Sequence, residues 1–227
     1  MAFQRYAVYH TPQGALGRFG ADWLGWDLES GQPTTPPDIE GLPAPWDDIT
    51  GTPRKYGFHA TIKPPFHLAE GWTESDLLTA FTTHCDLAAP VTLDGLELAQ
   101  LGRFLALVPT GDTGPLNRLA ADTVRTLDPF RAALTDADLA RRRASGLTPE
   151  QDALLLHWGY PYVMDQFRCH YTLSGKLPKA QARRLHATLE PVVAPLIPRP
   201  FTLDTLSLCG EDAQGRFHFI HRATLSG

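Results

Sequence analysis

The chain has 227 residues, of which 43% are hydrophobic, so it is long enough to bury a substantial core in one large domain or two closely joined lobes. Its net charge is −5 at pH 7, and its densest basic cluster, Arg141–Arg143, is interpreted as a solvated helix face, so polynucleotide binding is not favoured. No stretch is apolar enough to cross a membrane, and residues 1–6 lack a signal-peptide core, so we expect a cytoplasmic protein.

The N-terminal part is expected to supply one strand and one helix. The alternation over residues 5–10 predicts a strand, and residues 13–26 favour a helix. Residues 31–51 contain five prolines and are predicted to form an irregular loop.

Two later segments share the order strand, helix, hairpin. In the first, residues 56–63 are predicted to be extended up to Pro64, and a helix is predicted from Thr73. Two hairpin strands follow at 92–98 and 103–108. Residues 114–134 and 136–157 are predicted to be mostly helical, with an interruption at 145–149, and the second segment then comprises 166–174, the helix 178–193, and strands at 202–208 and 217–224.

A short motif opens both segments, as His59-Ala60-Thr61-Ile62 and as His170-Tyr171-Thr172-Leu173. Alternate residues of a strand point to the same face, so each copy presents a histidine and a threonine together. Two such strands would place two imidazoles and two hydroxyls around one cleft, a set of groups suited to phosphodiester cleavage. The three cysteines show no metal-ligand spacing, and we expect neither a metal nor a cofactor.

A third match, His186-Ala187-Thr188-Leu189, lies among good helix formers after Pro178. On a helix, residues two apart do not share a face, so His186 is interpreted as a chance match.

An internal repeat favours the pairing of His59 with His170. Residues 90–98 and 200–208 are identical at six of nine positions, and the offset between these segments is within one position of the offset between the two histidines. We expect a single bilobal domain over residues 1–227, with approximate repeats 52–110 and 163–227 and the largely helical segment 111–160 between them. The oligomeric state stays open.

These residues resemble the 2H phosphoesterase superfamily, which is named for two such motifs on symmetry-related strands. Residues 54–66, 159–165 and 167–175 resemble a bacterial branch whose genes often accompany phosphonate-degradation operons of the carbon–phosphorus lyase type. The resemblance implies an α+β fold with pseudo-two-fold symmetry, in which two antiparallel sheets form a central cleft and helices lie outside. It also implies activity on cyclic phosphodiesters or RNA-type 2′ linkages.

The motif residues suggest a mechanism in which one histidine accepts a proton from water and the other donates one to the leaving oxygen. Thr61 and Thr172 would donate to the nonbridging phosphate oxygens. Which histidine is the base stays open.

Strand parity nominates further residues for binding a small anionic substrate. Lys63 is two residues beyond Thr61, and Arg168 is two residues before His170. The other candidates are aromatic residues at strand starts and basic residues before the first motif: Tyr9, Tyr160, Arg54 and Lys55.

The favoured function is therefore metal-independent hydrolysis of a small cyclic phosphodiester, with 5-phosphoribosyl 1,2-cyclic phosphate as the candidate implied by the phosphonate association. The alternatives are an RNA-type 2′,3′-cyclic phosphodiesterase or 2′,5′ ligase or esterase, and a non-catalytic module that binds a sugar phosphate or nucleotide.

Overall fold

The structure is a computed structural model, and it describes residues 3–227. Its strands are β1 (Arg5–His10), β2 (Ala60–Phe66), β3 (Val91–Leu93), β4 (Gly95–Leu101), β5 (Phe104–Thr110), β6 (Tyr171–Thr172), β7 (Phe201–Leu203), β8 (Thr205–Glu211) and β9 (Phe217–Thr224). Its α-helices are α1 (Gly14–Leu24), α2 (Trp46–Arg54), α3 (Glu74–Leu87), α4 (Gly114–Thr126), α5 (Asp136–Arg143), α6 (Pro149–Trp158) and α7 (Lys179–Val193). Short 3₁₀ turns occupy η1 (Asp128–Phe130), η2 (Met164–Gln166) and η3 (Ala194–Leu196).

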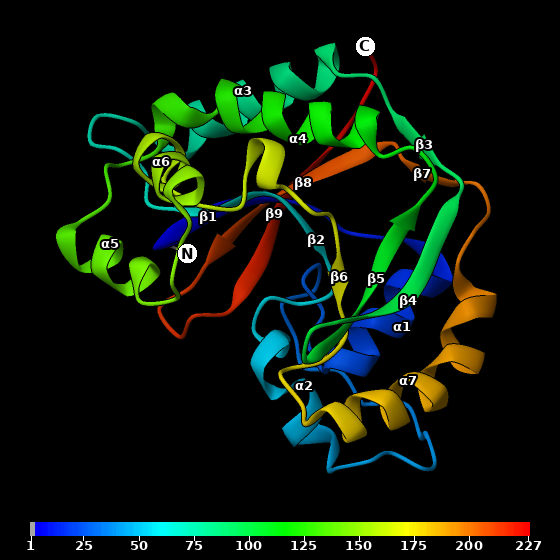
Figure 1. Cartoon of the computed structure of the whole chain (residues 1–227). Helices are drawn as coiled ribbons and strands as arrows, with labels where there is room; N and C mark the ends of the chain where they lie inside the picture. The colour runs from blue at the N-terminus through cyan, green and yellow to red at the C-terminus, as the bar shows by residue number, and fades with distance from the viewer. Residues whose placement is uncertain (1–2) are drawn as a thin grey trace.

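The strands form an antiparallel seven-stranded sheet in the order β4-β5-β6-β2-β1-β8-β9, and β3 pairs with β7 in a second, two-stranded sheet. Helices α3, α4 and α6 lie on one side of the strands, and α1, α2 and α7 lie on the other (Figure 1). The α+β class with two antiparallel sheets and helices outside is thus confirmed. In the centre of the large sheet, β2 pairs with β6 through Ala60 and Tyr171.

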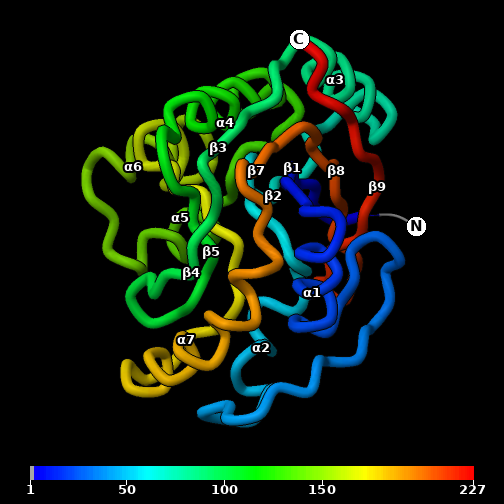
Figure 2. Tube along the Cα trace, turned by 90° about the vertical axis from the view of Figure 1, so that its right-hand side faces the viewer, coloured from blue at the N-terminus to red at the C-terminus, as the bar shows by residue number. Residues whose placement is uncertain are grey.

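The pairs between the two repeated segments are symmetric. In the small sheet Thr92 lies opposite Thr202, its counterpart in the repeat, and Val91 lies opposite Leu203. Figure 2 shows β3 and β7 running side by side. Ala60 and Tyr171, which also pair, are the corresponding residues of the two motifs. We propose that the chain is one bilobal domain whose two repeats are related by an approximate two-fold axis through these pairs.

Side-chain caps fix where the helices around the cleft begin. Thr135 starts α5, accepting from the backbone of Asp138 while the carboxylate of Asp138 accepts from the backbone of Thr135. Thr148 caps α6 in the same way, with Pro149 in the first turn. Helix α6 stops at Gly159, whose φ of 75° favours glycine and whose Cα lies against the Arg131 side chain.

Some predicted elements differ from the structure. The proline-rich segment was expected to be irregular over residues 31–51, but α2 begins at Trp46, with Asp47 and Asp48 in its first turn and Ile49 buried. The second motif strand is much shorter than predicted, because the only ladder partners of β6 are Ala60 on one side and two residues of β5 on the other.

Strand β2 also runs through the two prolines instead of ending before them, and it carries two irregularities against β1. Tyr9 pairs with Thr61, Val8 with Lys63 and Tyr6 with Phe66, so β2 gains one extra residue in each of the two intervals. Since Val8 and Tyr9 are adjacent in β1 and point to opposite faces, Thr61 and Lys63 do so as well.

Among residues 3–227, no helix combines the length and the apolar character that crossing a bilayer requires.

Candidate active site

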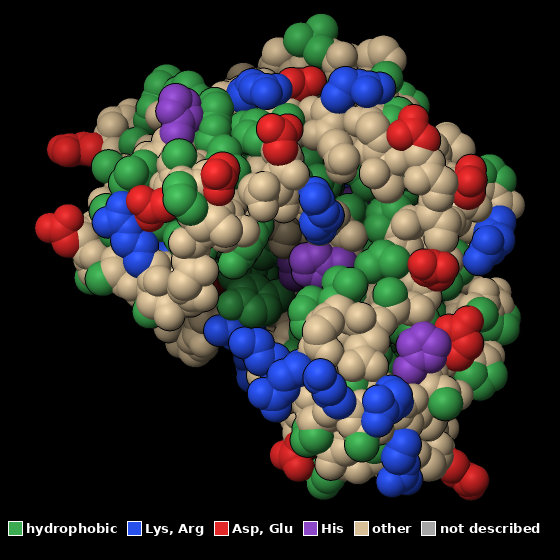
Figure 3. Space-filling model, in the orientation of Figure 1, with side chains coloured by type: hydrophobic (Ala, Val, Ile, Leu, Met, Phe, Trp, Pro, Cys, Tyr) green, Lys and Arg blue, Asp and Glu red, His purple; other side chains and the backbone are tan. Residues whose placement is uncertain are grey.

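A cavity of about 1130 Å³ opens beside the central strands, and all four motif residues, His59, Thr61, His170 and Thr172, line it. Figure 3 shows a hollow near the centre of this face, with a histidine at its margin and Lys or Arg side chains above and below it. A smaller cavity of about 400 Å³ is lined by residues 10–16 and by residues of the segment 195–205, and none of the motif residues lines it.

The ring of His59 is fixed by two hydrogen bonds. Nδ1 lies 3.0 Å from the carbonyl oxygen of Gly57, and Nε2 lies 3.2 Å from Oγ1 of Thr61. A backbone carbonyl can only accept, so Nδ1 carries the proton and the lone pair of Nε2 accepts from the threonine hydroxyl.

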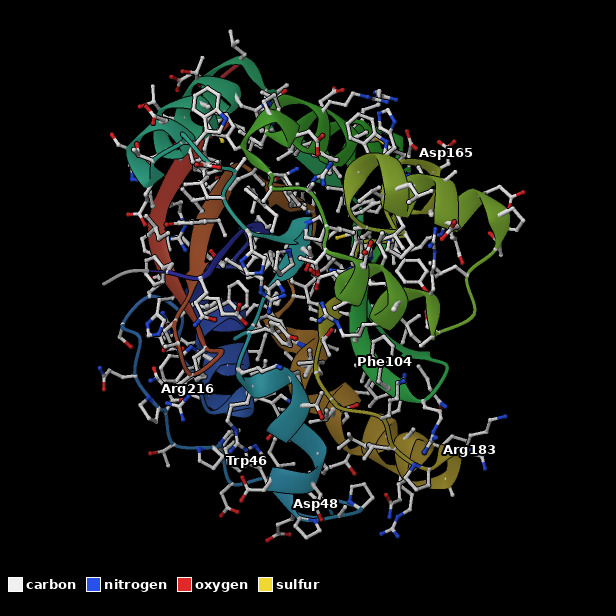
Figure 4. All side chains as sticks on the ribbon, turned by 90° about the vertical axis from the view of Figure 1, so that its left-hand side faces the viewer. Trp46, Asp48, Phe104, Asp165, Arg183 and Arg216 are labelled. Carbon is white, nitrogen blue, oxygen red and sulfur yellow. The ribbon has the colours of Figure 1, made fainter. Side chains whose placement is uncertain are left out.

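The ring of His170 is held in the same way. Nδ1 lies 2.7 Å from the carbonyl oxygen of Arg168, which is two residues earlier, as Gly57 is for His59. The ring of Phe104, from β5 and labelled in Figure 4, lies 5.8 Å from the His170 ring. Both histidines therefore keep Nδ1 on the backbone, so Nε2 is the atom that can serve a ligand. On His59 the ligand would take the place of the Thr61 hydroxyl.

The pKa of His59 is lowered to about 4. Burial of the ring is the largest cause, and the nearby His170 lowers it further, whereas the hydrogen bond to Gly57 opposes both. Tyr9 stacks on the ring with centroids 3.7 Å apart, which contributes to that burial. His59 is accordingly neutral near pH 7, the state in which Nε2 can accept a proton.

Of the nominated basic residues, Arg168 lines the cavity, whereas Arg54, Lys55 and Lys63 do not. Arg168 lines the cavity, where its Nη1 donates to the carbonyl oxygens of Asp165 and Phe167 at 3.0 and 2.6 Å. Lys55 is exposed and does not line the cavity; its Nζ lies 4.9 Å from the ring of Tyr56, which does.

Lys63 does not face the cavity, contrary to the prediction from strand parity. It is buried, with Nζ donating to the carbonyl oxygen of Val124 at 3.2 Å and lying 3.8 Å from Asp128. Burial is the main reason that its pKa falls to about 8. The extra residue in β2 between the partners of Val8 and Tyr9 reverses the face and turns Lys63 inward.

Arg54 was also nominated for substrate binding and is instead a packing residue. Its Nε donates to the carbonyl oxygen of Leu24, its Nη2 pairs with Asp47 at 2.7 Å, and its guanidinium lies 4.0 Å from the ring of Trp46, labelled on α2 in Figure 4. Its donors are used between α1 and α2, so it does not reach the cavity.

Both nominated tyrosines line the cavity. Tyr9 is buried beneath His59, and burial raises its pKa well above the ordinary value. Tyr160 is partly buried and faces the guanidinium of Arg142, whose central carbon is 4.7 Å from the ring.

Sequence reasoning missed many of the cavity residues, among them Arg5, Tyr56 and Arg142. Arg5 lies four residues before Tyr9 in β1, so strand parity applied from Tyr9 would have found it. In a regular strand Tyr56 would point away from the face of His59, but the chain before β2 is not a regular strand, and the Tyr56 ring lies 6.3 Å from that of His59.

Arg142 belongs to the basic cluster that we expected to be a solvated helix face. Arg141 and Arg143 are exposed and Arg142 is partly buried, and both Arg141 and Arg142 line the cavity. The location of Arg142 depends on how α5 packs, which no local pattern in the sequence reveals.

The cavity lining is basic although the chain is acidic. Five arginines and two carboxylates line it, against a net charge of −5 for the whole chain. Within residues 3–227 no group of three or more His, Cys, Asp or Glu side chains is placed to hold a metal ion. The three cysteines in that range are free and buried.

Residues 61–218 match the family model described as "Protein of unknown function (DUF1045)". The chain is 36% identical over 218 residues to a protein of Janthinobacterium sp. (strain Marseille) named ribose 1,5-bisphosphate phosphokinase PhnN, an alignment that covers 93% of this chain and 48% of that protein. A protein of the same name from Laribacter hongkongensis (strain HLHK9) is 35% identical over 76% of this chain and 40% of its own length. The chain thus spans about half the length of these curated relatives or less.

Two solved structures align with nearly the whole chain, at lower sequence identity than the relatives above. One is described as TT0787 of Thermus thermophilus, with a TM-score of 0.44, 14% identity and 98% of each chain covered. The other is LigT of E. coli complexed with 3′-AMP, with a TM-score of 0.43, 15% identity and 100% of each chain covered.

Proposed function

This chain belongs to the DUF1045 family, and on that premise we propose that its cleft hydrolyses a small cyclic phosphodiester with His59 and His170 as the acid–base pair. The chain's own motifs support a 2H phosphoesterase, and the proposal adds the reaction and the substrate. The observation that carries it is the matched placement of the two histidines in one basic cavity. Each holds Nδ1 on the carbonyl oxygen two residues earlier, so Nε2 is the reacting atom, and that of His59 is freed when the Thr61 hydroxyl turns to the phosphate.

The reaction balances without any further reactant. A water oxygen attacks phosphorus, a P–O bond of the ring breaks on the opposite side, and the products are a phosphate monoester and a free hydroxyl. His59, neutral near pH 7, takes the proton of the attacking water, while a protonated His170 gives its proton to the leaving oxygen. The pair ends with its protons exchanged, and solvent restores the starting state.

Charge develops on the nonbridging oxygens in the transition state, so donors beside the histidines are needed. Thr61 and Thr172 line the same cavity as the imidazoles, and Arg168 shares the backbone segment that anchors His170. A bound phosphate would also oppose the lowering of the His59 pKa, because a nearby negative charge favours the imidazolium.

The candidate substrate is 5-phosphoribosyl 1,2-cyclic phosphate. Opening of its ring by cleavage between phosphorus and the 2-oxygen gives ribose 1,5-bisphosphate, the compound in the name of the relatives. This cleft offers two acid–base groups, so we assign to it the cyclic-ester step that supplies this compound, and not the kinase step that consumes it. The 2-oxygen is then the group that His170 protonates.

The test is turnover in the presence of EDTA, comparing 5-phosphoribosyl 1,2-cyclic phosphate with 2′,3′-cyclic nucleotides. We expect the wild type to prefer the former and release ribose 1,5-bisphosphate, and His59→Ala and His170→Ala each to lower kcat at least ~10²-fold. His186→Ala is the control; it matches the motif in sequence but lies on α7 and donates to Leu98, so we expect little change. Preference for the nucleotides would instead favour the RNA-type activity, and a folded protein inactive on both would favour a binding module.

A further inference from the structure

Three consecutive arginines at the end of α5 have three different environments. Arg141 pairs with Asp138 at 2.5 Å, and Arg143 pairs with Asp152 of α6 at 2.6 Å. Arg142 has no carboxylate within ion-pair distance among residues 3–227, and its buried Nε has no hydrogen-bond partner there.

Leaving a buried donor of a charged group unpaired is costly, and such groups in folded proteins usually have a partner. The pKa of Arg142 is lowered, first by burial and then by the like charges of Arg141 and Arg5, while Tyr160 and Asp138 act in the opposite direction. Burial therefore outweighs the attraction of Asp138, which is paired with Arg141 and does not pair with Arg142.

The stacking of Arg142 on Tyr160 determines which of its atoms remain available. The central guanidinium carbon lies over the ring, 4.7 Å from its centroid, so the Tyr160 ring covers part of the group. The N–H donors of arginine lie in the plane of the group, where they bind two oxygens of a phosphate at once. A guanidinium fixed by its face is thus prepared to bind an anion by its edge.

Within residues 3–227, all but one of the other arginines that line the cavity are paired with a carboxylate. Arg5 forms a two-bond ion pair with Glu211, and Arg131 pairs with Asp128 at 2.8 Å. Arg168, beside His170, donates only to backbone carbonyls. The cavity therefore has two arginines without a carboxylate, one next to the reacting histidines and one on α5.

We propose that Arg142, stacked on Tyr160, binds a terminal phosphate monoester of the substrate, while the cyclic phosphate lies between the histidines and Arg168. This assignment rests on the proposed function and deepens it, because it makes the substrate class a cyclic phosphodiester that bears a second phosphate. It also supplies the cation for the 5-phosphate that Arg54 and Lys63 cannot provide, since both are used in packing.

The test compares two esters that differ only in the distal group, ribosyl 1,2-cyclic phosphate with and without the 5-phosphate. Loss of a charge-assisted contact to the distal phosphate should lower kcat/KM of Arg142→Gln roughly 10- to 100-fold for the phosphorylated ester. For the other ester we expect a change of less than about threefold. Arg142→Lys should retain part of the preference, because it keeps the charge but loses the two-oxygen geometry.

Arg143→Gln is the matched control, since it removes an arginine from the adjacent position of the same helix and leaves the cavity lining intact. It should leave the preference between the two esters unchanged. Thermal unfolding of each variant shows whether α5 and its surroundings remain folded. An equal loss on both esters by a folded Arg142→Gln protein, or no loss on either, would overturn the assignment.

A binding measurement separates this inference from the proposed reaction. Calorimetric titration with ribose 5-phosphate needs no turnover, and its affinity should fall at least tenfold in Arg142→Gln. If the wild type hydrolyses neither ester, the proposed function fails, but binding of ribose 5-phosphate that depends on Arg142 still supports the phosphate site. Ribose 5-phosphate that does not bind, or that binds equally to both proteins, contradicts the phosphate site even if the enzyme is active.

Discussion

Buried His10, at the end of β1, should make the fold sensitive to mild acid. The residue is 4% exposed, and its Nδ1 lies 2.7 Å from the hydroxyl of Tyr171, the residue that follows His170 in the second motif. The phenol donates this hydrogen bond if the imidazole is neutral. Burial, and to a lesser extent the charge of Arg222, lowers the pKa of His10 to about 3.

The sign and size of the effect follow from linkage between folding and protonation. Because the folded-state pKa lies below the unfolded value of about 6.5, both states are neutral above that value and stability is fully present. As the pH falls from 6.5 toward 3, the unfolded chain takes up the proton first and stability is lost. At pH 5 the loss from this one group is about 2 kcal/mol.

The assay is urea unfolding of wild type and His10→Asn at pH 7 and pH 5. Asparagine can still accept from Tyr171 but does not titrate, so the wild type should lose about 2 kcal/mol more than the variant over this interval. Other histidines contribute equally to both proteins and cancel in the difference. His221→Asn, at an exposed position of β9, is the control and should follow the wild type. Parallel loss of stability in wild type and His10→Asn would refute the reasoning.

Two further predictions concern the site. Lys63→Met should leave KM within about twofold, whereas Arg168→Gln should raise KM roughly tenfold, because only Arg168 lines the cavity. A larger effect on KM at Lys63 than at Arg168 would contradict the reversed face of β2. In the pH profile of kcat/KM, the acid limb should lie well below pH 6.5, because the pKa of His59 is lowered to about 4 in the free protein, and a limb at or above 6.5 would argue against His59 as the base.

The sequence alone located the motif residues. The offset between the repeated hairpin segments agrees to within one position with the offset between His59 and His170, and strand parity joins each histidine to its threonine. Both relations depend on local backbone geometry and on the duplication, and both of these can be recognised in the order of the residues. The structure accordingly brings all four motif residues to one cavity, and it puts the chance match at His186 on α7.

Strand parity failed where a partner strand altered the local geometry. Lys63 was nominated because alternate residues share a face, but β2 carries extra residues against β1 and the face is reversed. A bulge is a property of two strands paired together, so the sequence of one strand does not reveal it.

The environments of the arginines were also decided by tertiary packing. Arg54 and Arg142 are equally basic in the sequence, yet the first is used between α1 and α2, and the second stacks on Tyr160 in the cavity without a carboxylate. Which arginine is free to bind an anion depends on which carboxylates lie within a few ångströms. Some of these are near in sequence, as Asp47 is to Arg54, and others are far away, as Glu211 is from Arg5. The sequence determined which groups could do the chemistry, and the packing of the helices decided which cations remain for the substrate.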